Sequence, residues 1–99
     1  MRRIALKVEY DGTDFRGFQL QPDVRTVQGV LEHAVQQTTQ VHRRVQGGSR
    51  TDAGAHAEGQ VAHFDTDTDI STAQLVPALN YYLPADVAVR DAAEVDPDF

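Results

Sequence analysis

Two hydrophobic periodicities follow one another along this chain, and their order most constrains its fold. Residues 3–10 place an apolar side chain at every second position, which predicts a strand with one buried face. The side chains expected to be buried there are Ile4, Leu6, Val8 and Tyr10. After a loop over residues 11–25, residues 26–39 change to helical spacing, with Thr26 placed as the N-cap. The residues expected on the buried face of this helix are Val27, Val30, Leu31, Ala34 and Val35.

Two short strands are predicted next. Residues 41–46 form a weak strand pattern, and residues 60–65 form a clearer one. Residues 47–59 between them contain four glycines and read as a loop. Consecutive strands joined in this way predict a long-looped antiparallel hairpin.

A second helix is predicted to begin near Ser71, because Ser71 to Gln74 fit a capping box. The residues of this helix expected to face the core are Leu75, Leu79 and Tyr82. Pro77 lacks an amide hydrogen and therefore predicts a kink or a displaced helix start, whereas Pro84 ends the helix. Residues 86–91 predict the last strand.

The resulting order is βαββαβ, which predicts an α+β fold of the ferredoxin-like type: an antiparallel sheet with two helices on one face. A chain of 99 residues with 40% hydrophobic content is enough for one small domain over residues 1–99. Because this fold hosts many unrelated functions, the function has to be argued from particular side chains.

Composition excludes several classes of protein. The absence of cysteine excludes disulfides, thiolate nucleophiles and cysteine-ligated zinc. No apolar run approaches the roughly 18 residues that a membrane span needs, so a soluble cytoplasmic protein is expected. The net charge of −6 is unevenly distributed, since residues 1–50 hold eight basic and five acidic residues. An anionic partner would therefore meet the first half of the chain, although these arginines also fit an ordinary solvated surface.

The densest chemical signal lies in residues 47–59. Glycines flank a segment in which Arg50 and Asp52 are two residues apart. A neighbouring guanidinium would hold the carboxylate of Asp52 ionised and orient it, and such a carboxylate can serve as a nucleophile or as a base. The alternative is a turn in which Asp52 pairs locally with Arg50. A metal site formed by His56, Glu58 and His63 is a further alternative.

Residues 49–57, Ser-Arg-Thr-Asp-Ala-Gly-Ala-His-Ala, are similar to the Gly-Arg-Thr-Asp-Ala-Gly-Val-His-Ala motif of the tRNA pseudouridine synthase A family. Further resemblance follows in order along the whole chain, in residues 9–21, 25–32, 59–64 and 78–87. The sequence departs from the family pattern where it has Phe18 in place of tryptophan, Ser49 in place of glycine and Ala55 in place of valine.

The resemblance implies an isomerase that converts uridine to pseudouridine in the anticodon stem-loop of tRNA. Asp52 matches the catalytic aspartate and would attack either the base or the ribose C1′, and Arg50 would pair with it. Residues with implied RNA-binding roles are Arg16, Phe18, Gln19, Gln21, Arg25, Thr51 and His56. The implied partner is tRNA, the implied assembly is a homodimer, and no metal or organic cofactor is implied.

The family also has a second domain of similar architecture, which would begin just after residue 99. The chain is therefore expected to be the N-terminal, aspartate-bearing domain, with the C-terminal domain absent. An exposed sheet edge and self-association are expected of such a half. The alternative function is a non-catalytic half-domain that binds RNA or dimerises.

Overall fold

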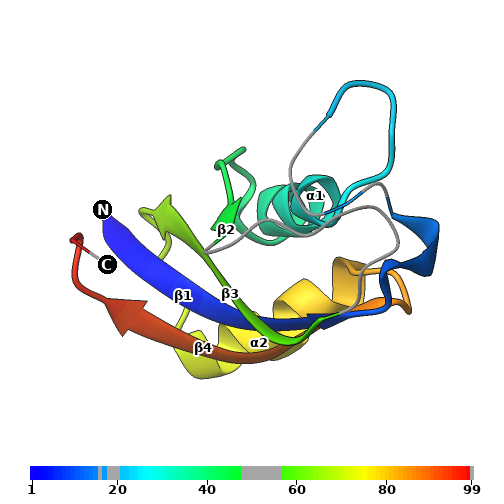
Figure 1. Ribbon diagram of the computed structural model, residues 1–99. Coiled ribbons are helices and arrows are strands. Elements are labelled where there is room, and N and C mark those ends of the chain that lie inside the picture. The colour runs from blue at the N-terminus through cyan, green and yellow to red at the C-terminus, as the bar shows by residue number, and fades with distance from the viewer. Residues whose placement is uncertain (16, 18–20, 48–56, 99) are drawn as a thin grey trace.

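A computed structural model describes residues 1–15, 17, 21–47 and 57–98, and for residues 57–59 it describes the backbone alone. The elements in chain order are β1 (Arg2–Tyr10), the 3-10 turn η1 (Gly12–Asp14), α1 (Val27–Thr39), β2 (Gln46–Gly47), β3 (Ala57–Thr66), α2 (Thr72–Tyr82) and β4 (Val87–Val95). This is the predicted βαββαβ order, and the α+β fold class is confirmed (Figure 1).

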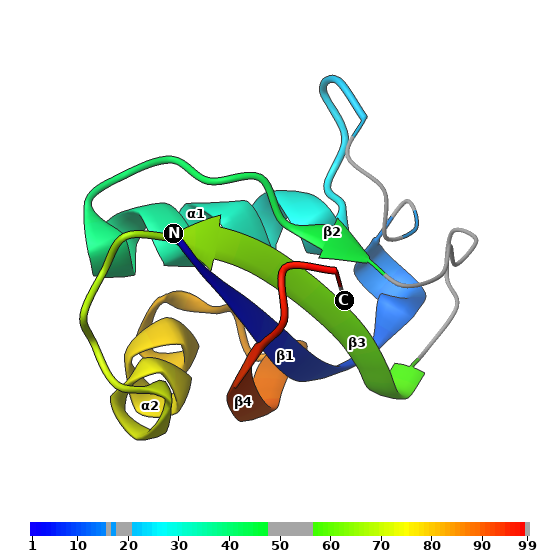
Figure 2. The ribbon, with the colours of Figure 1, turned by 90° about the vertical axis from the view of Figure 1, so that its left-hand side faces the viewer.

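The four strands form one antiparallel sheet in the order β2-β3-β1-β4 (Figure 2). The first strand, β1, lies inside the sheet and pairs with both β3 and β4. On its β4 side, Arg3 pairs with Val95, so the beginning of the first strand lies beside the end of the last. The predicted hairpin is also confirmed, because Gln46 pairs with His63 and Gly47 with Ala62.

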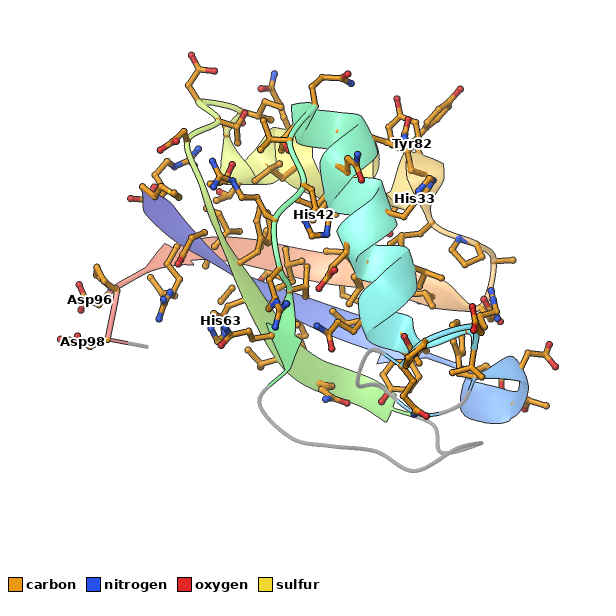
Figure 3. The ribbon with its side chains drawn as sticks, turned by 90° about the horizontal axis from the view of Figure 1, so that it is seen from above. His33, His42, His63, Tyr82, Asp96 and Asp98 are labelled. Carbon is orange, nitrogen blue, oxygen red and sulfur yellow. The ribbon has the colours of Figure 1, made fainter. Side chains whose placement is uncertain are left out.

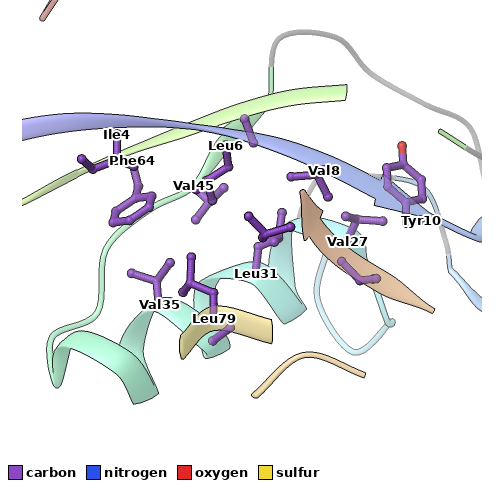
Figure 4. Packing of buried hydrophobic residues seen from close by; sticks show 14 of the residues in the cluster. Ile4, Leu6, Val8, Tyr10, Val27, Leu31, Val35, Val45, Phe64 and Leu79 are labelled. Atoms are coloured by element: carbon purple, nitrogen blue, oxygen red, sulfur yellow. The ribbon is translucent and has the colours of Figure 1, made fainter. Parts of the chain in front are cut away.

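One core fills the space between the sheet and the two helices, which cover the same face of the sheet (Figure 4). The alternation predicted for β1 is confirmed, since all four of its apolar even-numbered side chains are buried. The other large buried side chains come from both helices, from β3 and β4, and from the residues just after η1 and just before β2: Phe15, Val27, Leu31, Val35, Val45, Phe64, Leu75, Leu79, Val87 and Val89.

Both helices begin where the sequence predicts. The Thr26 side-chain oxygen accepts a hydrogen bond from the amide of Gly29 at 3.2 Å, and Ser71 accepts one from Gln74 at 3.2 Å. Each cap satisfies an amide that has no partner within its own helix. At the other end, α1 stops at Gln40, whose φ of 67° is left-handed. Neither described helix is long and apolar enough to cross a membrane.

The strand predicted over residues 41–46 is wrong in extent. β2 comprises only Gln46 and Gly47, because the residues before it are held by α1 rather than by a neighbouring strand. The amide of Val45 donates to the Glu32 carboxylate of α1 at 3.0 Å, a contact that takes the place of strand pairing. In contrast, β3 and β4 both extend beyond the predicted strands, since each pairs with β1 along almost its full length.

Two expectations concern α2. Of the two effects predicted for Pro77, a displaced helix start does not occur, because Pro77 is the sixth residue of a helix that begins at Thr72 and runs on to Tyr82. The kink stays a prediction. A proline there removes a single hydrogen bond within the helix. Tyr82 does not enter the core, as it is 40% exposed and its ring meets the edge of Tyr81 with 4.9 Å between centroids. Leu83, one residue later, packs against the core instead.

Candidate active-site frame

Two of the nine predicted site residues, Gln21 and Arg25, lie in the part of the chain that the structure describes. The other seven lie outside the described residues, and their roles stay predictions: Arg16, Phe18, Gln19, Arg50, Thr51, Asp52 and His56. The structure does describe the residues that flank these two segments. It therefore shows how the backbone is held on either side of residues 48–56 and at the base of residues 16–24.

Arg25 joins three segments that are distant in the sequence. Its two terminal nitrogens donate to the two carboxylate oxygens of Asp86, at 2.8 and 2.9 Å. The same guanidinium lies over the ring of Phe15, 4.0 Å from its centroid, and Phe15 in turn meets Tyr10 edge to face. A bidentate pair of this kind fixes geometry as well as adding energy. Arg25 thus connects Phe15 and Asp86 beside the segment that contains the predicted RNA-binding residues. Its own RNA contact stays a prediction.

The Arg25–Asp86 pair predicts a dependence of stability on pH. The hydrogen bonds from Arg25 hold the pKa of Asp86 below its ordinary value. The pair therefore stabilises the fold fully above the ordinary pKa of an aspartate, about 4, and this contribution is lost as the pH falls through the lower folded value. Urea unfolding of wild type and Asp86→Asn is expected to differ by on the order of 1 kcal/mol at neutral pH, with the difference shrinking below about pH 4. A constant difference down to pH 2.5 would contradict this.

The backbone that leads into residues 48–56 is held by a buried carboxylate. Glu32, on α1, is 6% exposed and accepts three hydrogen bonds or close polar contacts. Its Oε2 accepts from the amide of Val45 at 3.0 Å and from the side chain of Gln28 at 2.9 Å, and its Oε1 lies 3.2 Å from Nε2 of His42. Sequence reasoning missed this cluster, although a signal was present. Gln28 and Glu32 are one turn apart and flank the apolar face of α1.

The backbone that leaves residues 48–56 is held by Tyr10. This residue is buried, and its hydroxyl donates to the side-chain oxygen of Gln60 on β3 at 2.8 Å. Tyr10 is also the strand partner of Ala57, beyond an irregularity in the β1–β3 register after Val8. The last residue of β1 therefore fixes the beginning of β3, where the chain returns from the predicted catalytic segment.

Most of the described basic side chains are already paired with acids. The ion pairs are Arg2–Glu94, Arg3–Asp65, Arg25–Asp86, Arg43–Asp67 and Arg90–Glu9. Lys7 and Arg44 differ, because each is exposed and makes no ion pair with another described residue. Arg44 directly precedes Val45, close to the predicted catalytic segment. These two cations are the described ones most available to an anionic partner.

The described histidines do not gather around a possible metal. His33, His42 and His63 lie on α1, on the segment after it, and on β3 (Figure 3). Within the described residues, no three histidine or acidic side chains are placed to hold an ion. Burial lowers the pKa of His63, with Arg3 contributing in the same direction. The alternative metal site also needs His56 and the side chain of Glu58, which lie outside the described residues.

Comparison with known proteins now adds an independent finding. The family model described as tRNA pseudouridine synthase matches residues 6–99. A protein named tRNA pseudouridine synthase A from Maridesulfovibrio salexigens is 52% identical over 99 residues, which cover all of this chain and 36% of that protein. Proteins of the same name from Halalkalibacterium halodurans and Limosilactobacillus fermentum are 50% and 53% identical, over all of this chain and 38% and 40% of those proteins.

The chain thus spans somewhat more than a third of the length of these relatives. The match is nonetheless continuous, since the family model covers every described strand and helix apart from the first residues of β1. A match of this extent, on the fold that the sequence predicts, shows that the chain belongs to the tRNA pseudouridine synthase family.

Proposed function

We propose that this chain is the aspartate-bearing part of an enzyme that isomerises uridine to pseudouridine in the anticodon stem-loop of tRNA. The observation that carries this proposal is the family match over residues 6–99, because that range includes Arg50, Asp52 and the segment around them. The anchors on both sides of that segment support it, since a catalytic group requires a backbone held in a fixed place.

In the proposed reaction, the C1′–N1 glycosidic bond of uridine breaks, the base turns, and a new bond forms between C1′ and C5. The base loses the proton on C5 and gains one on N1, so the reaction is a net isomerisation with no cosubstrate. The Asp52 carboxylate attacks either the base or C1′, and the covalent intermediate divides one difficult step into two easier ones. Arg50 keeps that carboxylate ionised.

The target nucleotide has to leave the base stack before its glycosidic bond can be reached. In this proposal Gln21, with the predicted residues Arg16, Phe18 and Gln19, contacts the tRNA beside the displaced nucleotide, and Thr51 and His56 contact it beside Asp52. Arg25 supports that segment from its base. Phosphate contacts position the tRNA without reading its sequence. Action in the cytoplasm, as a homodimer and without metal or organic cofactor, is part of the same proposal.

A second candidate function is a half-domain that binds RNA or dimerises without catalysis. The observation in its favour is the coverage, because relatives that match the chain are more than twice as long. In addition, the sheet order leaves β4 paired on one side only among the described residues. An unpaired strand edge can pair with another chain.

The two candidates are distinguished by mapping pseudouridine on an unmodified tRNA transcript. One reaction contains this chain, and a second contains the chain fused to the part of the Maridesulfovibrio salexigens protein that it does not match. Modification confined to the anticodon arm in either reaction supports the catalytic proposal. Specific tRNA binding without modification in both reactions favours the half-domain, and modification elsewhere in the tRNA overturns the proposed substrate site.

Arg44 provides a test of phosphate contact. Because it is exposed and unpaired among the described residues, Arg44→Ala is expected to weaken tRNA binding and to reduce the slope of log K against log salt by about 1 or less. Arg44→Lys keeps the charge and is expected to preserve the slope. Arg90→Ala, which removes a cation already paired with Glu9, is expected to change the slope less. Equal slopes for Arg44→Ala and wild type in a salt titration would exclude this contact.

A further inference from the structure

Glu32 is the one acidic side chain among the buried polar residues of the described part of the chain. It lies on the core side of α1, between Leu31 and Val35 in position, and it is 6% exposed. His42, whose Nε2 lies 3.2 Å from Oε1 of Glu32, has a side chain that is 61% exposed and therefore remains at the solvent boundary. A buried carboxylate is unfavourable unless hydrogen-bond donors replace its lost water. Glu32 has such donors, and their positions in the fold indicate which parts of the chain it holds together.

The polar partners of Glu32 lie on two parts of the chain. Gln28 belongs to the same helix, one turn earlier, and forms the buried side of the cluster. Val45 and His42 belong to the segment that runs from α1 to β2. The carboxylate therefore connects a rigid helix to the backbone immediately before β2. Because α1 packs in the core, it can hold in place a neighbouring segment that has no regular structure of its own.

β2, the strand that follows, is too short to hold this backbone in place alone. β2 contributes two residue pairs to the sheet, Gln46 with His63 and Gly47 with Ala62. Residue 48 follows immediately, and Asp52 is five residues beyond Gly47 in the sequence. The Val45 amide thus connects the backbone to α1 three residues before residue 48, where the predicted catalytic segment begins. On the C-terminal side of that segment, the Tyr10–Gln60 hydrogen bond connects β3 to β1.

We propose that Glu32 is a positioning residue for catalysis, which fixes the backbone leading into the Asp52 segment through the amide of Val45. This inference rests on the proposed function for its catalytic consequence. Glu32 does not touch the substrate, and its effect passes through residues 45–47. Misplacement of a reacting group by about 1 Å can lower a rate roughly 10²-fold. Loss of the Glu32–Val45 hydrogen bond can therefore lower the rate even though Glu32 does not contact the substrate.

The geometry makes two substitutions at Glu32 informative. In Glu32→Gln, an amide oxygen in the place of Oε2 can still accept from both Val45 and Gln28, and the amide nitrogen faces His42. In Glu32→Ala, no carboxylate remains to accept from the Val45 amide or from the Gln28 side chain. Val35→Ala is the matched control, because it truncates a buried side chain one turn further along α1 without removing a polar contact.

The first measurement is hydrogen exchange by NMR, which does not depend on activity. In Glu32→Ala, the Val45 amide is expected to exchange at least tenfold faster than in wild type, relative to the amides of β1. Glu32→Gln is expected to stay within threefold of wild type, and Val35→Ala to speed exchange of Val45 and β1 equally. Equal acceleration of Val45 and β1 in Glu32→Ala would mean a general loss of stability and would overturn the proposal.

The second measurement is single-turnover pseudouridine formation at saturating tRNA, using whichever protein forms pseudouridine in the mapping experiment. Glu32→Ala is expected to lower the rate at least tenfold while the Kd for tRNA stays within threefold, and Glu32→Gln is expected to restore the rate. A loss that Glu32→Gln does not restore, or that Val35→Ala reproduces, would overturn the positioning role. If wild type forms no pseudouridine, the proposed function fails on its own test, while the exchange result still decides whether Glu32 anchors Val45.

Discussion

Asp52→Asn is expected to abolish pseudouridine formation while tRNA binding and folding are retained. An amide of the same shape cannot form the covalent intermediate that the proposed mechanism requires. Removal of a nucleophile from a site whose groups act together commonly costs on the order of 10⁴-fold in rate or more. The measurement is the single-turnover rate on an unmodified tRNA transcript, with the Kd for tRNA determined in parallel.

Asp91→Asn is the matched control for this prediction. It makes the same chemical change at an exposed residue of β4, whose register partner in the sheet is Lys7 of β1. Its rate is expected to remain close to that of wild type. Retention of more than about a tenth of the wild-type rate by Asp52→Asn would exclude Asp52 as the nucleophile and favour a supporting role such as the local turn.

Phe64→Ala is expected to leave the chain with little net stability at 25 °C. Phe64 is 1% exposed, lies on β3 and is the largest fully buried side chain of the described residues. Truncation of a buried phenylalanine costs about 3–5 kcal/mol through lost burial and the remaining cavity. Small domains have total stabilities near the lower end of roughly 5–15 kcal/mol, so most of the reserve is removed. Urea unfolding followed by far-ultraviolet circular dichroism measures the effect.

Tyr81→Ala removes an aromatic ring of similar size from the surface. Tyr81 is 81% exposed, and its ring contact is with the half-exposed Tyr82. The expected change is within about 0.5 kcal/mol, as for most surface substitutions. A Phe64→Ala protein with an unchanged urea midpoint would show that the core between the sheet and the helices does not provide the stability of the chain.

The predictions from sequence succeeded where local pattern and local chemistry agree. The alternation of β1 and the caps at Thr26 and Ser71 depend on residues within a few positions of one another, and all are confirmed. The strand predicted over residues 41–46 was wrong in extent, because a contact from Glu32, thirteen residues before Val45, replaces strand pairing there. Periodicity carries no information about such a partner.

In the candidate site, too, local features could be predicted from the sequence and contacts between distant residues could not. The motif around Asp52 can be read from consecutive residues, and it lies within the range that the family model matches. The partner of Arg25 could not be predicted in this way, because Asp86 is 61 residues away and is brought near only by the fold. Counting charges also overestimated the cations free to meet RNA, since five of the described arginines are paired with acids. Which charges remain available is decided by tertiary contacts.

The place of β1 in the sheet has a consequence for the synthesis of the protein on the ribosome. Among the strands of this sheet, the first to be made is one that needs partners on both sides, and these partners begin at Ala57 and Val87. An incomplete nascent chain therefore holds the apolar face of β1 and the matching face of α1 without the strands that complete the sheet. Sheets built from distant segments form late, and partly made ones expose surfaces that aggregate. The sheet of the described residues is complete only when β4 has been translated.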